Sequence, residues 1–157
     1  MGGTWTGVQE SEDGGITWKK LNVPAENRIF GLAYNPDTDE LVAMGRNVFS
    51  SWRQGIGEDL RAKGGLEKQE FYAGAPYTQP WFDPARRAIL VPVLCYSEGD
   101  QRRLILFSFR QGEVERLAEL SLDKEPIYVG RSEGHLYVAT AGPRGGKLYL
   151  LSLSRGS

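Results

Sequence analysis

The sequence predicts an all-β protein of the β-propeller type, a repeat of four-stranded antiparallel blades, and three observations support this. Short apolar or alternating segments rich in β-branched and aromatic residues recur along the 157 residues, as expected for strands. Gly, Pro, Asp and Asn lie between these segments, as turns require. A unit of strand, polar turn and strand recurs at a separation of 48 residues, from position 34 to 82 and from 82 to 130. Repeats of about this length are typical of propeller blades.

The strand segments can be placed in order. Two N-terminal segments, TWTGVQ (4–9) and ITWKKL (16–21), flank a polar turn. The only segment with helical character is GEDLRAKGGLEKQ (57–69), and its paired glycines argue against a long helix. Six later segments have the clearest strand pattern: IFGLAYN (29–35), ELVAMG (40–45), RAILVPVLC (87–95), RLILFSF (103–109), HLYVATA (135–141) and KLYLLSL (147–153).

Two sets of turns recur in step with each other. The first set lies within AYNPDTDELVA (33–43), WFDPARRAILV (81–91) and VGRSEGHLYVA (129–139). The second set places Ser four residues before Gly after a strand, and two of its members, SWRQG (51–55) and SFRQG (108–112), are nearly the same phrase. An antiparallel sandwich with similar turns is the alternative. Two sets in step favour the propeller-type repeat.

The earliest member of the second set is SEDGGITW, with the pattern Ser-x-Asp-x-Gly-x-Thr-Trp at Ser11, Asp13, Gly15, Thr17 and Trp18. This stretch resembles the Asp-box, or BNR repeat, a hairpin of the sialidase-like β-propeller superfamily. The other copies keep only Ser and Gly, so the chain is similar to a non-catalytic or partial member. The resemblance implies that the hairpin joins the third and fourth strands of a blade, away from a central site.

The chemistry of this stretch suits a structural turn. Asp13 can accept hydrogen bonds from amides across the loop, Gly15 can take a positive φ, and Ser11 can bond to nearby backbone. We expect Trp18 to bury its ring against neighbouring strands and hold the hairpin in place. A calcium loop needs more oxygen ligands than this run supplies, so we predict no metal here.

The repeats divide the chain into blades. We expect one propeller-type domain or propeller fragment over 1–157, with a partial blade at 1–24, blades at 28–72 and 76–120, and a partial blade at 125–154. The fourth strand of the earlier complete blade is expected at EKQEFY (67–72). About three blades are fewer than the roughly 4 to 8 that close a ring. Self-association or the remainder of a longer propeller is therefore expected, with a compact four-bladed ring as the other arrangement.

A ligand-binding face is expected where the loops between second and third strands, and between blades, come together. Guanidinium groups converging there would suit a carboxylate or phosphate. The alternative is that they are solvated loop arginines. The candidates are Arg46, Arg102, Arg103 and Arg144 with Tyr96, and Tyr77, Glu98 and Glu125 lie on the same inferred face.

A sialidase-like glycoside hydrolase, whose site forms only in a complete or assembled ring, is the alternative function. The resemblance implies an Arg-Ile-Pro motif, a Tyr and Glu nucleophile pair and an acidic Asp. Here Arg28 and Ile29 are followed by Phe30, so the first element is absent. Glycoside hydrolysis needs two carboxylates at a defined separation, and the sequence places no such pair. We assign no catalytic residue.

Composition excludes other classes. A formal net charge of -1 and arginines spread through turns give no basic stripe for nucleic acid. No apolar run is long enough to cross a bilayer. Cys95 and His135 are each the only residue of their type, so no disulfide, Cys/His metal cluster or cofactor is predicted. We expect Cys95 to be a small buried hydrophobe. The N-terminal segment lacks the pattern of a signal peptide, and no compartment is predicted.

The sequence thus predicts a non-catalytic β-propeller binding or scaffold module with a protein or glycan partner. An assembly or chaperone-like factor of the Asp-box type is compatible with this prediction. A shallow face with exposed aromatic and apolar side chains would favour a protein partner or self-association.

Overall fold

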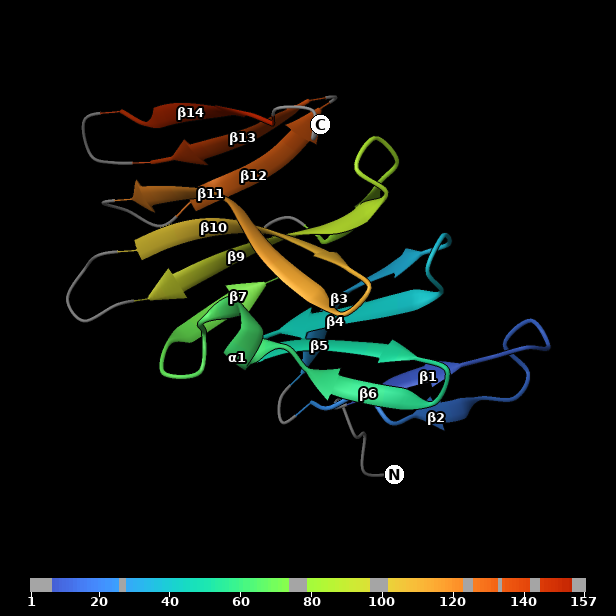
Figure 1. Ribbon diagram of the computed structural model, residues 1–157. Coiled ribbons are helices and arrows are strands. Elements are labelled where there is room, and N and C mark those ends of the chain that lie inside the picture. The colour runs from blue at the N-terminus through green and yellow to red at the C-terminus, as the bar shows by residue number, and fades with distance from the viewer. Residues whose placement is uncertain are drawn as a thin grey trace.

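The computed structural model describes residues 7–25, 28–73, 79–96, 102–122, 126–132, 134–141 and 145–153. Within these residues the chain is all-β with antiparallel sheets and one short helix, which confirms the expected class. Four sheets lie one beside another in chain order (Figure 1). The described strands do not close into a ring or a barrel.

The first two sheets in the chain are a hairpin and a four-stranded sheet. The hairpin consists of β1 (Val8–Glu10) and β2 (Lys19–Leu21). The sheet that follows, called sheet I, is an antiparallel meander of β3 (Ile29–Asn35), β4 (Glu40–Gly45), β5 (Val48–Arg53) and β6 (Ile56–Asp59). Helix α1 (Arg61–Gly64) follows and ends at Gly65, whose φ is 71°. The short helix agrees with the sequence prediction, since a glycine with positive φ ends a helix readily.

Two further sheets complete the stack. Sheet II contains β7 (Glu70–Ala73), β8 (Trp81–Asp83), β9 (Ala88–Tyr96), β10 (Arg102–Arg110) and β11 (Glu113–Leu122). Strands β7 and β8 both pair with β9, which pairs with β10 on its other side. Sheet III contains β12 (Pro126–Ser132), β13 (His135–Thr140) and β14 (Lys147–Ser152), paired in that order.

The expected fourth strand of the earlier blade, EKQEFY, is a wrong prediction. The fourth strand of sheet I is β6, and Glu70–Ala73 instead joins sheet II, where Phe71 pairs with Cys95. The reason is the turn after β5, where Gln54 and Gly55 have φ of 48° and 82°. Two successive residues with positive φ form a tight hairpin turn, so the next strand follows immediately.

The two sets of repeated turns occupy equivalent places. Gln111 and Gly112 have φ of 50° and 76°, so SFRQG makes the same turn between β10 and β11 as SWRQG makes between β5 and β6. The 48-residue set marks the connections β3–β4, β8–β9 and β12–β13. These turns and the β1–β2 loop lie on one edge of the stack, on the right in Figure 1, which we call the turn edge.

A buried apolar cluster lies between each pair of consecutive sheets. Because successive side chains of a strand point to opposite faces, the inner sheets present an apolar side to each neighbour. The cluster between the hairpin and sheet I contains Val8, Leu21, Val23 and Ala43. The cluster between sheets I and II includes Val42, Met44, Phe49, Ile89, Val91 and Phe107. The cluster between sheets II and III contains Leu94, Leu104, Leu122, Val129, Leu136 and Val138.

Buried polar side chains join sheets I and II at the turn edge. Asn35 donates through Nδ2 to the Arg87 carbonyl at 3.0 Å. The carboxylate of Glu40 accepts hydrogen bonds from the backbone N–H groups of Gln111 at 2.7 Å and Gly112 at 3.0 Å. Asn35 and Glu40 are 0% and 3% exposed. The β3–β4 turn of sheet I is therefore hydrogen-bonded to the β8–β9 and β10–β11 turns of sheet II.

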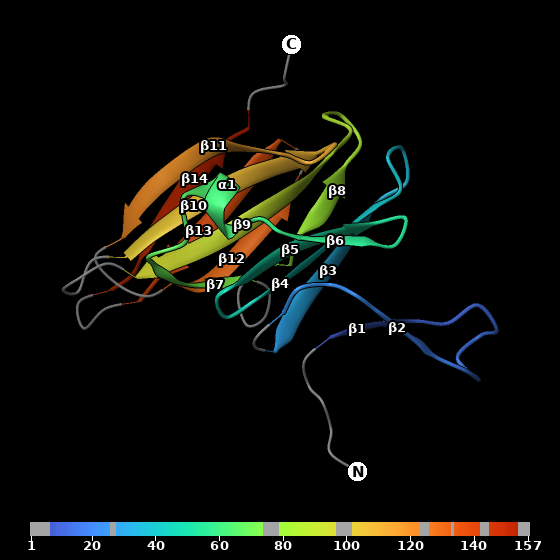
Figure 2. The ribbon, with the colours of Figure 1, turned by 60° about the horizontal axis from the view of Figure 1, so that its bottom comes forward.

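The segment after the hairpin crosses sheet I at very short range. Trp52 donates through Nε1 to Oδ1 of Asn22 at 2.8 Å, and Ser50 donates its hydroxyl to the Pro24 carbonyl. A Cβ on Gly57 would lie 1.9 Å from the Asn22 carbonyl oxygen. Only glycine permits this approach, which fixes the hairpin beside sheet I (Figure 2).

Candidate functional site

Ser11, Asp13, Gly15 and Thr17 form a self-contained turn. Gly15 donates its amide to the Ser11 hydroxyl at 2.8 Å, and that hydroxyl donates to Asp13 Oδ1 at 2.9 Å. Thr17 donates its amide to the same carboxylate at 2.8 Å and also its hydroxyl. These bonds, the Thr17 hydroxyl first, lower the pKa of Asp13 from 3.8 to about 2. Gly15 has φ of 94°. The hydrogen bonds of Ser11 and Asp13 and the positive φ of Gly15 agree with the structural turn that the sequence predicts.

Trp18 does not behave as expected. It is 60% exposed, and its Nε1 donates to the Gly15 carbonyl at 3.0 Å. The ring therefore contacts its own loop instead of a neighbouring sheet. The physical reason is that β1 and β2 are three residues each, and no strand among the described residues pairs with the hairpin beyond them.

The edge opposite the turn edge, which we call the loop edge, brings the predicted candidates Arg46, Arg102 and Tyr96 into one neighbourhood. The β4–β5 turn is held there by Asn47, which has φ of 54°. Its amide donates to the Phe71 carbonyl at 3.0 Å, and its side-chain Oδ1 accepts from the Phe71 amide at 3.0 Å. Asn47 thus pairs with β7 as a strand residue would, and it places Arg46 next to sheet II.

At the loop edge two phenol rings lie in contact between two guanidinium groups, and we call these four side chains the tyrosine row. Arg46 lies over the Tyr72 ring, with 5.6 Å from Cζ to the ring centroid. Tyr72 meets Tyr96 edge to face at 5.4 Å and 82°. Arg102 lies over the Tyr96 ring at 5.6 Å. Cation–π and edge-to-face contacts each favour this order, so the row is held in place before any ligand arrives.

Arg103 lies on the other face of β10 from Arg102, because neighbouring residues of a strand point in opposite directions. Its guanidinium binds Glu119 at 2.7 Å and Gln69 Oε1 at 2.9 Å. Arg103 is therefore at the loop edge, but its guanidinium is held by Glu119 and Gln69 and is not part of the tyrosine row.

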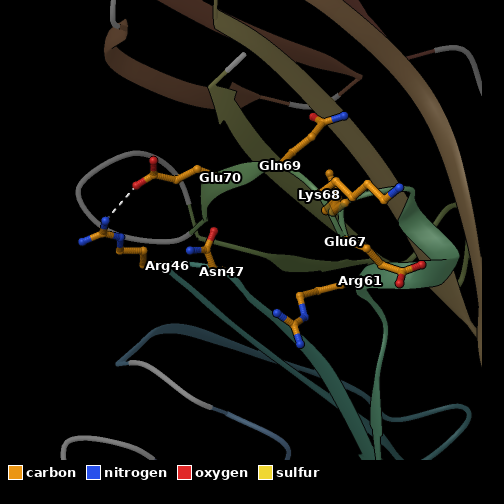
Figure 3. Close-up of a pocket in the computed structure, with 8 residues that line it drawn as sticks. Arg46, Asn47, Arg61, Glu67, Lys68, Gln69 and Glu70 are labelled. Atoms are coloured by element: carbon orange, nitrogen blue, oxygen red, sulfur yellow. Dashed lines mark hydrogen bonds and ion pairs between the residues drawn. The ribbon is translucent and has the colours of Figure 1, made fainter. Parts of the chain in front are cut away.

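A polar cleft of about 480 Å³ lies beside the row, between the β4–β5 turn and the segment from α1 to β7 (Figure 3). Across it, Arg46 and Glu70 form an ion pair at 2.8 Å, with 53% and 47% of their side chains exposed. Arg61 is bound by Asp59 at 2.6 Å, and this arginine lowers the Asp59 pKa. The cleft is lined by Arg46, Asn47, Arg61, Leu66, Glu67, Lys68, Gln69 and Glu70.

The sequence named three of the residues in this neighbourhood and missed two. Arg144, Tyr77, Glu98 and Glu125 lie outside the described residues. Glu70 and Tyr72 were not predicted because their segment was assigned to the wrong sheet. Their alternation with the buried Phe71 was the available signal, since it places both on one face of a strand.

Among the described residues, the carboxyl groups with a shifted pKa all have a pKa below the ordinary value. Asp37 is paired with Arg87 at 2.9 Å, which lowers its pKa, and Asp13 and Asp59 are lowered as described above. A general acid of glycoside hydrolysis needs a raised pKa. These three groups are therefore suited to ion pairing and hydrogen bonding, and not to proton donation.

In the part of the chain that the structure covers, no three His, Cys, Asp or Glu side chains group so that they could hold a metal ion. No helix there has the length and apolarity to cross a membrane. Cys95 is buried, as expected, and burial raises its pKa to about 11.

Comparison with models of known protein families, with curated proteins and with solved structures finds no match for this chain. Its function is therefore inferred from its own residues and geometry.

Proposed function

We propose that this chain is a non-catalytic, propeller-type binding module that contacts a protein partner through its loop edge. The observation that carries the proposal is the tyrosine row, in which two half-buried phenol rings are flanked by two guanidinium groups. Tyr and Arg are the side chains most enriched at the energetic centres of protein interfaces.

The propeller-type assignment is supported by the repetition along the chain. Strands β3–β6 of sheet I and β8–β11 of sheet II are antiparallel meanders with the same two-residue turn before the outer strand. Each is separated from the next sheet by an apolar cluster. The Asp-box hydrogen bonds of Ser11, Asp13 and Thr17 agree with the turn that the resemblance implies.

The row is prepared for binding because its members already restrict one another. Arg46 is fixed by both Glu70 and Tyr72, and the two rings contact each other. Side chains ordered in advance lose less conformational entropy when a partner binds. The adjoining cleft is mostly polar, which suits the rim of a protein interface better than an apolar pocket for a small ligand.

The charges of the site indicate the chemistry of the partner. Glu70 takes one nitrogen of Arg46, and a guanidinium group has five N–H donors in all. Lys68 is a further cation of the cleft, beside Arg61, which is paired with Asp59. A partner segment that carries carboxylates and an apolar side chain would complete hydrogen bonds to Arg46 and pack on the exposed parts of the rings.

Selection of displayed random peptides on the immobilised chain tests the proposal. We expect acidic peptides to be enriched and to bind the Arg46→Glu variant at least about tenfold more weakly, equivalent to about 1.4 kcal/mol. The control is Arg53→Glu, because Arg53 is an exposed arginine at the other end of β5. Peptides that bind both variants equally, or binding only to a glycan panel, would contradict the proposal. Turnover of a fluorogenic sialoside by the chain would contradict its non-catalytic part.

A further inference from the structure

The two ends of the sheet stack leave apolar surface uncovered. Inside the chain, every sheet-to-sheet contact buries such surface: the hairpin covers sheet I, sheet I covers sheet II, and sheet II covers sheet III. In each of these three contacts, one face of a sheet packs on the sheet before it in the chain, and its opposite face is left for the sheet after it. The described residues thus fix which side of each sheet meets the sheet before it and which side meets the sheet after it.

Sheet III has a bare face on the side where a following sheet would lie. Tyr149 and Leu151 of β14 pack against the cluster that joins sheets II and III. The alternating residues Leu148 and Leu150 point the other way and are 72% and 57% exposed, and Tyr128 of β12 is 62% exposed. We call Tyr128, Leu148 and Leu150 the bare face. Large apolar side chains gathered on one side of a sheet mark an interaction surface.

Sheet I has a groove on the side where a preceding sheet would lie. The hairpin covers only part of that side, and a groove of about 360 Å³ remains next to β1, lined mainly by Val8, Leu32, Tyr34, Leu41 and Trp52. Leu32 and Tyr34 are 49% and 51% exposed. They pair with Ala43 and Leu41 of β4, which pack against the hairpin. The groove is therefore a continuation of an apolar contact that is already formed.

We infer that two copies of this chain associate, with the bare face of each copy seated in the groove of the other, beside the other's β1–β2 hairpin. In this pair, the face of sheet III on which a next sheet would pack meets the face of sheet I on which a previous sheet would pack. Every sheet-to-sheet contact within the chain joins faces in this same order. The inference rests on the propeller-type repeat proposed above. The partner is a second copy because one chain carries both halves of the contact, on opposite ends of the stack.

The numbers of strands at the two ends agree with this partner. Sheet III has three strands and the hairpin has two, whereas sheet I has four. Sheet III of one copy, placed beside the hairpin of the other copy, would form with it a full layer that covers sheet I of that other copy.

The size of the contact favours a closed pair over an open row of copies. Strands about 4.8 Å apart that rise about 3.4 Å per residue give sheet III a footprint of about 300 Å². A stable interface covers roughly 800 Å² on each partner. In a twofold pair each copy takes part in two such contacts, so it buries about 600 Å² of surface, not counting the added area of protruding side chains. In an open row of copies, any two neighbours share a single contact and bury about half of that. The pair would contain about six layers, within the roughly 4 to 8 of closed propellers.

Disulfide trapping between variants that each carry one introduced cysteine tests the inference. Cys95 is 1% exposed with its pKa raised to about 11, so the native thiol stays silent. Leu32→Cys and Leu150→Cys are mixed under mild oxidation, and we expect a covalent pair of chains that neither variant gives alone. The matched control replaces Leu32→Cys by Ile56→Cys, since Ile56 is 72% exposed but lies outside the groove. Equal trapping with the control, or no trapping between variants that keep the wild-type circular dichroism, overturns the inference.

A charge variant gives an independent readout. Leu148→Glu with Leu150→Glu should lower the solution mass from two chains to one without loss of secondary structure, because both side chains are exposed within one copy. An unchanged mass of two chains would show that a different surface joins the copies. A wild-type mass of one chain would overturn the inference, and the bare face would then be covered by another protein or by further sheets of a longer chain. Arg46 belongs neither to the bare face nor to the lining of the groove, so peptide binding at Arg46 is a separate measurement and the two proposals fail separately.

Discussion

Replacing Glu40 by Gln should destabilise the junction between sheets I and II. The Glu40 carboxylate is 3% exposed and accepts two backbone hydrogen bonds, from Gln111 at 2.7 Å and Gly112 at 3.0 Å. A glutamine keeps one carbonyl oxygen and turns an NH₂ group toward the other amide. The change removes one charge-assisted bond of about 1.5–3 kcal/mol and leaves buried donors facing each other.

We therefore expect a loss of about 3 kcal/mol in the free energy of unfolding, or a fall in Tm of about 6–12 °C for a chain of this size. Urea and thermal unfolding followed by tryptophan fluorescence measure both quantities. The control is Glu115→Gln, an exposed position on β11, which should change the free energy by about 0.5 kcal/mol or less. A Glu40→Gln variant as stable as this control would refute the view that the turn edge fastens the two sheets.

Further predictions concern the core, the turn around Asp13, the hairpin and the thiol. Phe107→Ala should lose about 3–5 kcal/mol of unfolding free energy, because the ring is fully buried 5.7 Å from Phe49; a loss under about 1 kcal/mol would contradict the packing. The lowered pKa of Asp13, about 2 against 3.8, means that its contribution to stability is present above about pH 4 and is lost as the pH falls through 2; an NMR titration giving an ordinary value in the folded chain would disprove the hydrogen bonds. Gly57→Ala should displace the hairpin and speed amide exchange in β1 and β2, since its Cβ would meet the Asn22 carbonyl at 1.9 Å; unchanged exchange would exclude this close approach. Cys95 should react with a thiol reagent at neutral pH only after unfolding, because burial raises its pKa; rapid reaction in the folded chain would place the thiol at the surface.

Much of the local structure followed from the sequence because turns are encoded by single residues. Gly55 and Gly112 each end a Ser-x-Arg-Gln-Gly stretch and take the positive φ that a two-residue hairpin needs. The Asp13 carboxylate was expected to bind amides across its loop, and it does. Local chemistry of this kind does not depend on the rest of the fold.

Strand partners and burial followed less well, because they depend on contacts far apart in the chain. The segment at Phe71 has a strand pattern whichever sheet it joins, and only its contact with Asn47 and Cys95 decides the matter. Trp18 was expected to be buried on the basis of its size, but burial requires a neighbouring sheet that the hairpin lacks.

The candidate site shows the same division. Arg46, Tyr96 and Arg102 were placed on one edge by the alternation of strands and loops, and the structure brings them together. Their spacing along a row depends on Tyr72, whose position could not be known until its strand was assigned to sheet II. The sequence could therefore name the edge but not the arrangement of its side chains.

The most direct test of this account measures the solution mass of the full chain by sedimentation equilibrium across a range of concentrations. A repeat of stacked sheets that is open at both ends, with complementary apolar surfaces, should give twice the 17.5 kDa of one chain at high concentration and return to one on dilution. A mass of one chain at every concentration would contradict the account.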